Sequence, residues 1–118
     1  MTLNPCNCED NGPKLIGSGT QVKLEVSNQP IGELTMDDYY FELEAYTTAG
    51  GRRTQLIKKD ETVRKASDRY AFIVDTSLLG TGELWIDQTA FIPDADAPGG
   101  TRKEVSINFT NMIVIKNR

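Results

Sequence analysis

The residues that could carry out chemistry in this chain are its cysteines and a few carboxylates. The sequence of 118 residues contains two cysteines, Cys6 and Cys8, and no histidine. A disulfide between residues so close in sequence would close a small, strained ring. A metal site would need further soft ligands, and histidine is not present to supply them. We therefore interpret the pair as two thiols on an N-terminal arm, and we expect no metal and no other cofactor.

Two pairs of aspartates are the remaining candidates for a reaction centre. Asp37 and Asp38 precede a predicted strand, whereas Asp94 and Asp96 lie in a loop with proline and glycine. Calcium takes about six to eight oxygen ligands and the loop supplies two, so a turn stabilised by an aspartate side chain is the better interpretation. General acid–base chemistry favours histidine, and the sequence has no nucleophile elbow, P-loop or dinucleotide-binding motif. We therefore expect that the protein is not an enzyme.

A carbohydrate-binding module is the alternative class of function, because sugars stack on exposed aromatic rings. The candidate rings are Trp85, Tyr39, Tyr40, Tyr46 and Phe91. Of these, we name Trp85, Tyr40 and Tyr46 as the side chains that would face a ligand. A single tryptophan in a β-domain more often packs in or near the core. Our first interpretation therefore includes no small-molecule ligand.

The charge of the chain argues against two classes of partner. The net charge is −4, so the phosphates of nucleic acids and of anionic lipids repel the protein. A local basic cluster at 58–65 is interpreted as a solvated strand edge. No apolar run approaches the roughly 18 residues of a membrane span, and the N-terminus lacks the pattern of a secretory signal. We expect synthesis in the cytoplasm, with neither nucleic acid nor membrane as a partner.

Composition divides the chain into an arm and one domain. Residues 1–19 are rich in asparagine, proline and glycine, which predicts an irregular N-terminal arm. From Thr20 the pattern changes to the period of two that is typical of strands, which places the domain at 20–118. The clearest strand has Tyr39, Phe41, Leu43 and Ala45 on one face and polar or aromatic residues between them.

The spacing of strands and turns predicts an all-β fold. We expect about seven strands at intervals of roughly ten residues. They are predicted near 22–26, 39–46, 54–59, 69–75, 82–92, 103–109 and 112–116, with a kink at Asn111 and either a bulge or an edge near Gln88. One helical turn is predicted at 75–80, capped by Asp75 or Thr76 and ended by a glycine. An antiparallel immunoglobulin-like β-sandwich fits best, and a small barrel is the alternative.

The C-terminal half resembles a known group of proteins. The run VDTSLLGTGELWIDQTAFIPDADAPGGTRKEV, residues 74–105, resembles structural proteins of phages and prophages of Bacteroidetes gut bacteria. In those proteins a VDTSKLGTG corner leads into a long strand and then an IPD-D-PDG-R-EV loop. The matching positions are Val74, Asp75, Thr76, Leu79, Gly80, Thr81, Gly82, Ile92, Pro93, Asp94, Asp96, Gly99, Arg102, Glu104 and Val105. Many of these residues make corners, so the resemblance implies a fold and a structural role.

The role that this resemblance implies is that of a virion protein, an adaptor or decoration subunit of the capsid, tail or fibre. Because the chain ends at Arg118, we expect a free-standing subunit. Its expected location is the virion and its expected partners are other virion proteins, contacted by multiple copies on a symmetric particle where weak contacts add. The arm residues that we expect to bind a partner are Leu3, Pro5, Cys6, Cys8, Leu15 and Ile16.

Overall fold

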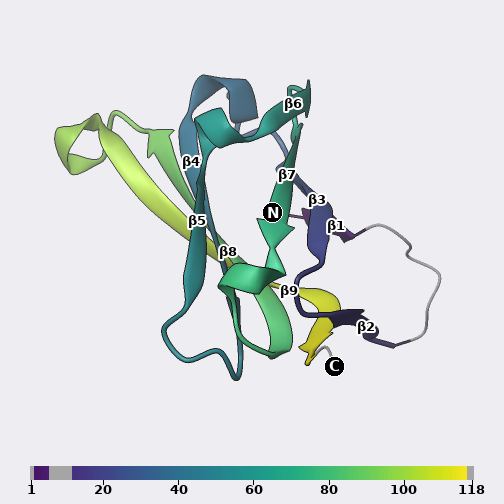
Figure 1. Ribbon diagram of the computed structural model, residues 1–118. Coiled ribbons are helices and arrows are strands. Elements are labelled where there is room, and N and C mark those ends of the chain that lie inside the picture. Colours follow the sequence, from purple (N-terminus) through teal and green to yellow (C-terminus); the bar gives the residue numbers. More distant parts are fainter. Residues whose placement is uncertain (1, 6–11, 117–118) are drawn as a thin grey trace.

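The computed structural model describes residues 2–5 and 12–116, whose strands form two sheets packed face to face (Figure 1). The four-stranded sheet has the order β1 (Thr2–Pro5), β3 (Gln21–Ser27), β7 (Arg69–Asp75), β6 (Val63–Ala66). The five-stranded sheet has the order β2 (Lys14–Gly17), β9 (Thr101–Ile115), β8 (Gly82–Pro93), β4 (Tyr40–Thr47), β5 (Thr54–Lys58). All neighbours are antiparallel except β2 and β9. The predicted all-β class is confirmed, but these sheets hold more strands than the seven expected.

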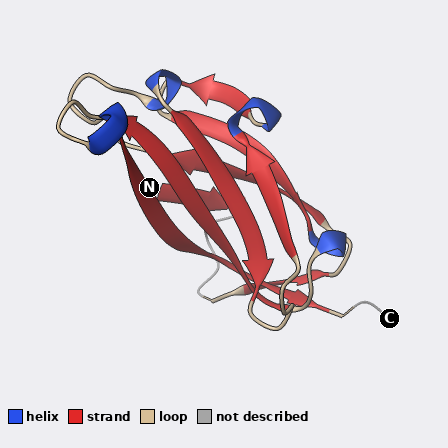
Figure 2. Cartoon of the chain, turned by 90° about the vertical axis from the view of Figure 1, so that its left-hand side faces the viewer, coloured by secondary structure: helices blue, strands red, loops and turns tan. Residues whose placement is uncertain are grey.

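Short 3₁₀ turns join strands at the ends of the sandwich, where Figure 2 shows them in blue. They are η1 (Met36–Asp38), η2 (Lys59–Glu61), η3 (Thr76–Leu78) and η4 (Pro98–Gly100). The turn η3 confirms the predicted helical turn, because the Asp75 carboxylate accepts a hydrogen bond from Ser77 N at 3.0 Å. The glycine that follows in left-handed conformation is Gly82, with φ 107°.

The irregular arm predicted for residues 1–19 is wrong for the parts that the structure describes. β1 pairs with β3 in the four-stranded sheet, and β2 pairs with β9 in the five-stranded sheet. Local composition favoured turns, but an edge strand draws its hydrogen bonds from a neighbour far away in sequence, which composition does not reveal. Proline is compatible with such an edge, as at Pro5.

The core forms between the two sheets, mainly from alternate side chains of β3, β4 and β8. Its largest fully buried apolar residues are Phe41, Leu24, Met36, Leu43, Leu84, Ile86 and Ile92. Each such side chain stabilises the fold by about 1.5–3 kcal/mol. The bulge or edge predicted at Gln88 is wrong, because Gln88 pairs regularly with Leu43 on one side and Ser106 on the other and is buried. The irregularity of β8 lies between Glu83 and Trp85, opposite the kink in β9.

The first half of β9 reverses the usual alternation of a strand. Val105 and Ile107 pair with the outward residues Thr89 and Asp87, so they lie on the solvent side. The polar residues between them take the core side, where Ser106 pairs with buried Gln88. Beyond Asn111, whose φ is 63°, the pattern inverts and apolar side chains turn inward. The predicted kink at Asn111 is therefore present, within one continuous strand.

Thr110 holds the chain at this kink. Its hydroxyl donates to Leu84 O at 2.8 Å and accepts from Met112 N at 3.2 Å, and the side chain is buried. These bonds satisfy two backbone groups next to the register shift, where the ladder between β8 and β9 is interrupted.

Replacing Thr110 by valine keeps its shape and removes both bonds. We expect Thr110→Val to lower the free energy of unfolding by about 1–3 kcal/mol, because Leu84 O would be left buried without its partner. Urea denaturation followed by tryptophan fluorescence measures this. Thr54→Val, at an exposed position of β5, is the control and should change stability by less than about 0.5 kcal/mol. Equal stability of the Thr110→Val protein and the wild type would contradict the role of the hydroxyl.

Candidate functional site

The outward surface of the five-stranded sheet is the candidate functional site, and we call it the open face. The registers of β5, β4, β8 and β9 bring alternate residues of these four strands onto one surface. Its members are Thr54, Leu56 and Lys58 from β5; Tyr40, Glu42, Glu44 and Tyr46 from β4; Trp85, Asp87, Thr89 and Phe91 from β8; and Lys103, Val105, Ile107 and Phe109 from β9.

Aromatic rings lie toward both ends of the open face. At one end the rings of Tyr40 and Phe91 stack with centroids 5.8 Å apart. At the other end the rings of Trp85 and Phe109 lie 5.2 Å apart, and Tyr46 is the cross-strand neighbour of Trp85. Because each ring packs against a partner on the next strand, the rings are held in place before any ligand arrives.

Carboxylates occupy the middle of the open face. Glu44 and Asp87 lie directly opposite each other on β4 and β8, with Glu42 on the same surface. Tyr46 donates a hydrogen bond to Asp87 at 3.0 Å, and Tyr40 donates one to Glu42 at 2.9 Å. Partial burial and these bonds raise the pKa of Tyr46 and raise the pKa of Tyr40 to about 12. The phenols therefore remain donors at neutral pH. The three carboxylates outnumber Lys58, which lies opposite Glu42, so the centre of the face is acidic.

Exposed aliphatic side chains flank the carboxylates. Leu56 is 49%, Val105 54% and Ile107 63% exposed. Neighbouring large apolar side chains on a surface are typical of contact sites. Aliphatic and aromatic groups around an acidic centre suit the binding of a broad surface.

Sequence reasoning identified part of the open face. The structure brings the predicted residues Trp85, Tyr40 and Tyr46 onto it, although Trp85 is half-buried and Tyr40 lies at the end far from the other two. Val105 and Ile107 were missed. The alternation of 103–109 was visible in the sequence, but its usual interpretation turns apolar residues toward the core.

Of the six arm residues predicted to bind a partner, the four that the structure describes lie on two strands of different sheets. Leu15 is exposed on β2, whereas Ile16 is buried in the core. Leu3 and Pro5 belong to β1. Cys6 and Cys8 lie outside the described residues.

Two of the aspartates considered for chemistry, Asp37 and Asp94, are engaged in structural bonds. Asp37 accepts from Arg64 at 2.8 Å and also from the hydroxyl of Tyr70. Asp94 accepts from Asp96 N at 2.9 Å and pairs with Arg102, which confirms the predicted aspartate turn. Within residues 2–5 and 12–116, no group of three or more acidic or cysteine side chains is arranged to hold a metal, and no helix is suited to crossing a membrane.

A polar recess of about 260 Å³ lies on the core side of β9. The inward residues Glu104 and Ser106 line it together with Gln88 and Asn28. Gln88 Nε2 and Asn28 Oδ1 are buried and make no hydrogen bond to another described group. They are a donor and an acceptor that an ordered water could satisfy together. The recess follows directly from the reversed alternation of β9.

Comparison with known proteins gives no assignment. No family model, no curated protein and no solved structure matches the chain.

The bonds of Asp37 predict a dependence of stability on acid. The hydrogen bonds from Arg64 and Tyr70 lower the pKa of Asp37 from 3.8 to about 2. Because the folded pKa is below the unfolded one, Asp37 stabilises the fold above pH 4 and this contribution is lost as the pH falls toward 2. We expect Asp37→Asn to remove that part of the acid sensitivity.

Urea midpoints at pH 6, 4 and 2.5 test this expectation. The difference between wild type and Asp37→Asn should be greatest at pH 6 and shrink toward pH 2.5. Asp96→Asn, at an exposed position of the β8–β9 turn, is the control. Parallel pH profiles of the wild type and the Asp37→Asn protein would show that the ion pair does not stabilise the fold.

Proposed function

We propose that the protein is a non-enzymatic structural subunit of a bacteriophage particle, which acts as an adaptor or decoration subunit of the capsid, tail or fibre. The observation that carries the proposal is the outward placement of Val105 and Ile107 on the open face. A strand with apolar residues every second position would normally turn them inward. Their exposure costs stability in the isolated domain and is explained if another protein covers them.

The resemblance of residues 74–105 to phage structural proteins is the reason for expecting other virion proteins as partners. In the structure this run forms the corner at η3, the central strand β8, the turn at η4 and the start of β9. It therefore builds two of the four strands that form the open face. Many copies on a symmetric particle would let a contact of modest affinity at each face add to a stable attachment.

We further infer that the sandwich is immunoglobulin-like. In such domains one sheet has the strand order A, B, E, D and the other has C, F, G, extended in variable-type domains beyond C. The order β1, β3, β7, β6 corresponds to the first sheet, and β9, β8, β4, β5 to G, F, C and the added strand. β1 and β2 then form a first strand that switches from one sheet to the other.

The test of the proposed function is attachment to particles. A tagged copy of the chain is expressed in the cell that carries its gene, and phage particles are collected on a density gradient. We expect the chain in the particle fraction, with about tenfold less of an Ile107→Asp protein, because a charge would be buried at the contact. Leu78→Asp, at an exposed position in η3, is the matched control and should attach normally.

Two results would contradict the proposal. One is absence of the wild-type chain from purified particles. The other is equal attachment of the Ile107→Asp and wild-type proteins, which would show that the open face is not the contact.

Carbohydrate binding is a second candidate, favoured by one observation. Trp85 and Tyr46 are adjacent on the open face, and Asp87 beside them is a hydrogen-bond acceptor for sugar hydroxyls. A row of rings with a nearby carboxylate is able to hold a saccharide by stacking and hydrogen bonding.

A glycan array distinguishes this candidate from the first. If the open face binds sugar, Trp85→Ala should lower binding at least about tenfold while circular dichroism stays unchanged, because one stacking surface is lost. The control is Ile107→Asp, which alters the same face and leaves the Trp85–Tyr46 pair intact. Lack of any glycan binding by the wild-type protein would remove the second candidate.

A further inference from the structure

A second surface, separate from the open face, lies where the two sheets meet at β5 and β7. The chain leaves β5, passes through η2 and reaches β6, which pairs only with Arg69–Ala71 of β7. The next residues of β7, Phe72–Asp75, pair with β3 on one side. On the other side, no strand of the described residues continues β6 along them. This half of β7 is therefore paired with a strand on one side only, and its other side is an open strand edge.

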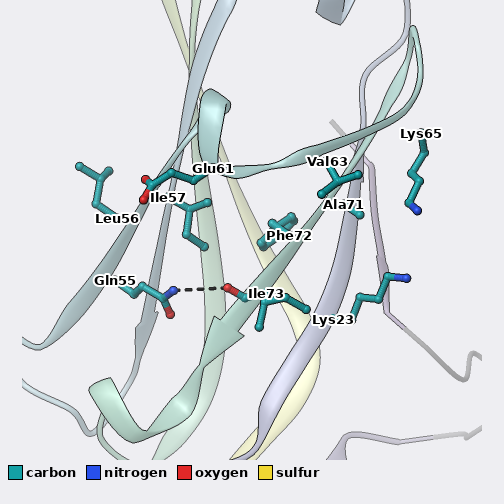
Figure 3. Close-up of a pocket in the computed structure, with 10 residues that line it drawn as sticks. All are labelled: Lys23, Gln55, Leu56, Ile57, Glu61, Val63, Lys65, Ala71, Phe72 and Ile73. Atoms are coloured by element: carbon teal, nitrogen blue, oxygen red, sulfur yellow. Dashed lines mark hydrogen bonds between the residues drawn. The ribbon is translucent and has the colours of Figure 1, made fainter.

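The carboxamide of Gln55 occupies that edge. Asp75 N donates to Gln55 Oε1 at 2.8 Å, and Gln55 Nε2 donates to Ile73 O at 3.3 Å, the bond drawn in Figure 3. These backbone groups flank Val74, and a residue of an added parallel strand would pair with the same two groups. A primary amide is chemically a peptide unit, so Gln55 satisfies the edge in the way that one peptide unit of a strand would.

A recess beside this edge has the lining expected for an extended peptide. It has a volume of about 330 Å³, and Ile57 and Phe72 form part of its wall between β5 and β7 (Figure 3). Val63 and Ile73 border it and are 58% and 47% exposed. In strand addition, main-chain bonds to the edge give affinity, and pockets for alternate side chains give specificity.

The charged side chains on the two sides of the recess have opposite signs. Lys23 and Lys65 lie together on the β3 and β6 side, whereas Glu61 lies on the β5 side (Figure 3). A peptide that enters along β7 would therefore be favoured by an acidic residue near the two lysines.

We propose that the recess between β5 and β7 binds an extended peptide segment of a partner protein, apolar at alternate positions and acidic at one end. The peptide adds as a strand along Phe72–Asp75 and replaces the Gln55 carboxamide at Ile73 O and Asp75 N. One of its apolar side chains enters the recess, and its acidic end meets Lys23 and Lys65. The inference does not depend on the open face or on the virion role.

Selection from a random ten-residue peptide library displayed on messenger RNA tests the proposal. Enriched peptides should alternate apolar with polar residues, carry aspartate or glutamate toward one end and lack proline in the middle. Hydrogen–deuterium exchange of the complex should show added protection of the Ile73 and Asp75 amides, which face the open edge, and no change at Phe72 and Val74, whose amides face β3. Methylation of alternate backbone nitrogens of an enriched peptide should abolish binding, because those groups are needed for the ladder.

Three variants and one control separate the parts of the proposal. Ile73→Lys should weaken a selected peptide at least tenfold, and Lys65→Glu should weaken it about tenfold. Gln55→Ala should strengthen binding, because the competing amide is gone. Val105→Lys on the open face should bind like the wild type, and thermal melts show that each variant is folded.

The proposal is overturned by any of three results. One is that no peptide is enriched over a control without the protein. Another is that enriched peptides bind the Ile73→Lys and Lys65→Glu proteins as tightly as the wild type. The third is that backbone methylation leaves binding unchanged.

Discussion

The register of β9 on β8 is the constraint on which the rest of this structure depends. Because side chains alternate across a strand, a slip of one residue would exchange the two faces of β9 completely. Val105, Ile107 and Phe109 would then turn toward the core, and Glu104 and Ser106 would turn to solvent. The kink at Asn111 prevents this, because it lets the last part of β9 bury Met112 and Val114 while the first part faces the other way. The Thr110 hydroxyl completes the hydrogen bonding at that point.

Two surfaces follow from this register. On the outside, β9 contributes aliphatic groups next to the acids and rings of β4 and β8, which makes the open face. On the inside, its polar residues line a recess with the buried amides of Gln88 and Asn28. An apolar side chain left in water forgoes roughly 1.5–3 kcal/mol of burial. We infer that this cost is offset when a partner covers the face.

The open edge of β7 must be protected in the folded protein and still be able to pair with a partner strand. β6 is short, and β7 would present unpaired backbone groups beyond it without Gln55. Natural sheets protect such edges because they pair readily with other chains. Here the protection is a single side chain that another peptide unit can replace.

Much of the fold could be predicted from the sequence. A strand in which apolar and polar residues alternate regularly turns its apolar face toward the core. The faces of 39–46 are an example, with Phe41, Leu43 and Ala45 buried and Tyr40 and Glu44 exposed. The edge strands β1 and β2 could not be predicted, since their stability comes from pairing with distant residues. The open face was predicted only through Trp85, Tyr40 and Tyr46. Its contribution from β9 contradicts the normal pattern, and only the register with β8 reveals it.

Residues 54–59 show that the sequence pattern also could not predict the recess between β5 and β7. The sequence does not decide which side of this strand faces the core, because Gln55, Ile57 and Lys59 share one side and Leu56 lies on the other. The structure turns Ile57 into the core and uses Gln55 to bond β7. A glutamine in a strand gives no sign of such a bond, which joins residues 18 apart in sequence.

Hydroxyl-radical footprinting of the free chain and of the chain bound to the proposed phage particle tests the central claim most directly. It measures the solvent exposure of individual side chains in both states. If the open face is the contact, Val105, Ile107 and Tyr40 should react readily in the free protein and be protected on the particle, while Leu78 reacts equally in both. Equal reactivity of Val105 and Ile107 in the two states would show that the reversed face of β9 is not a docking surface.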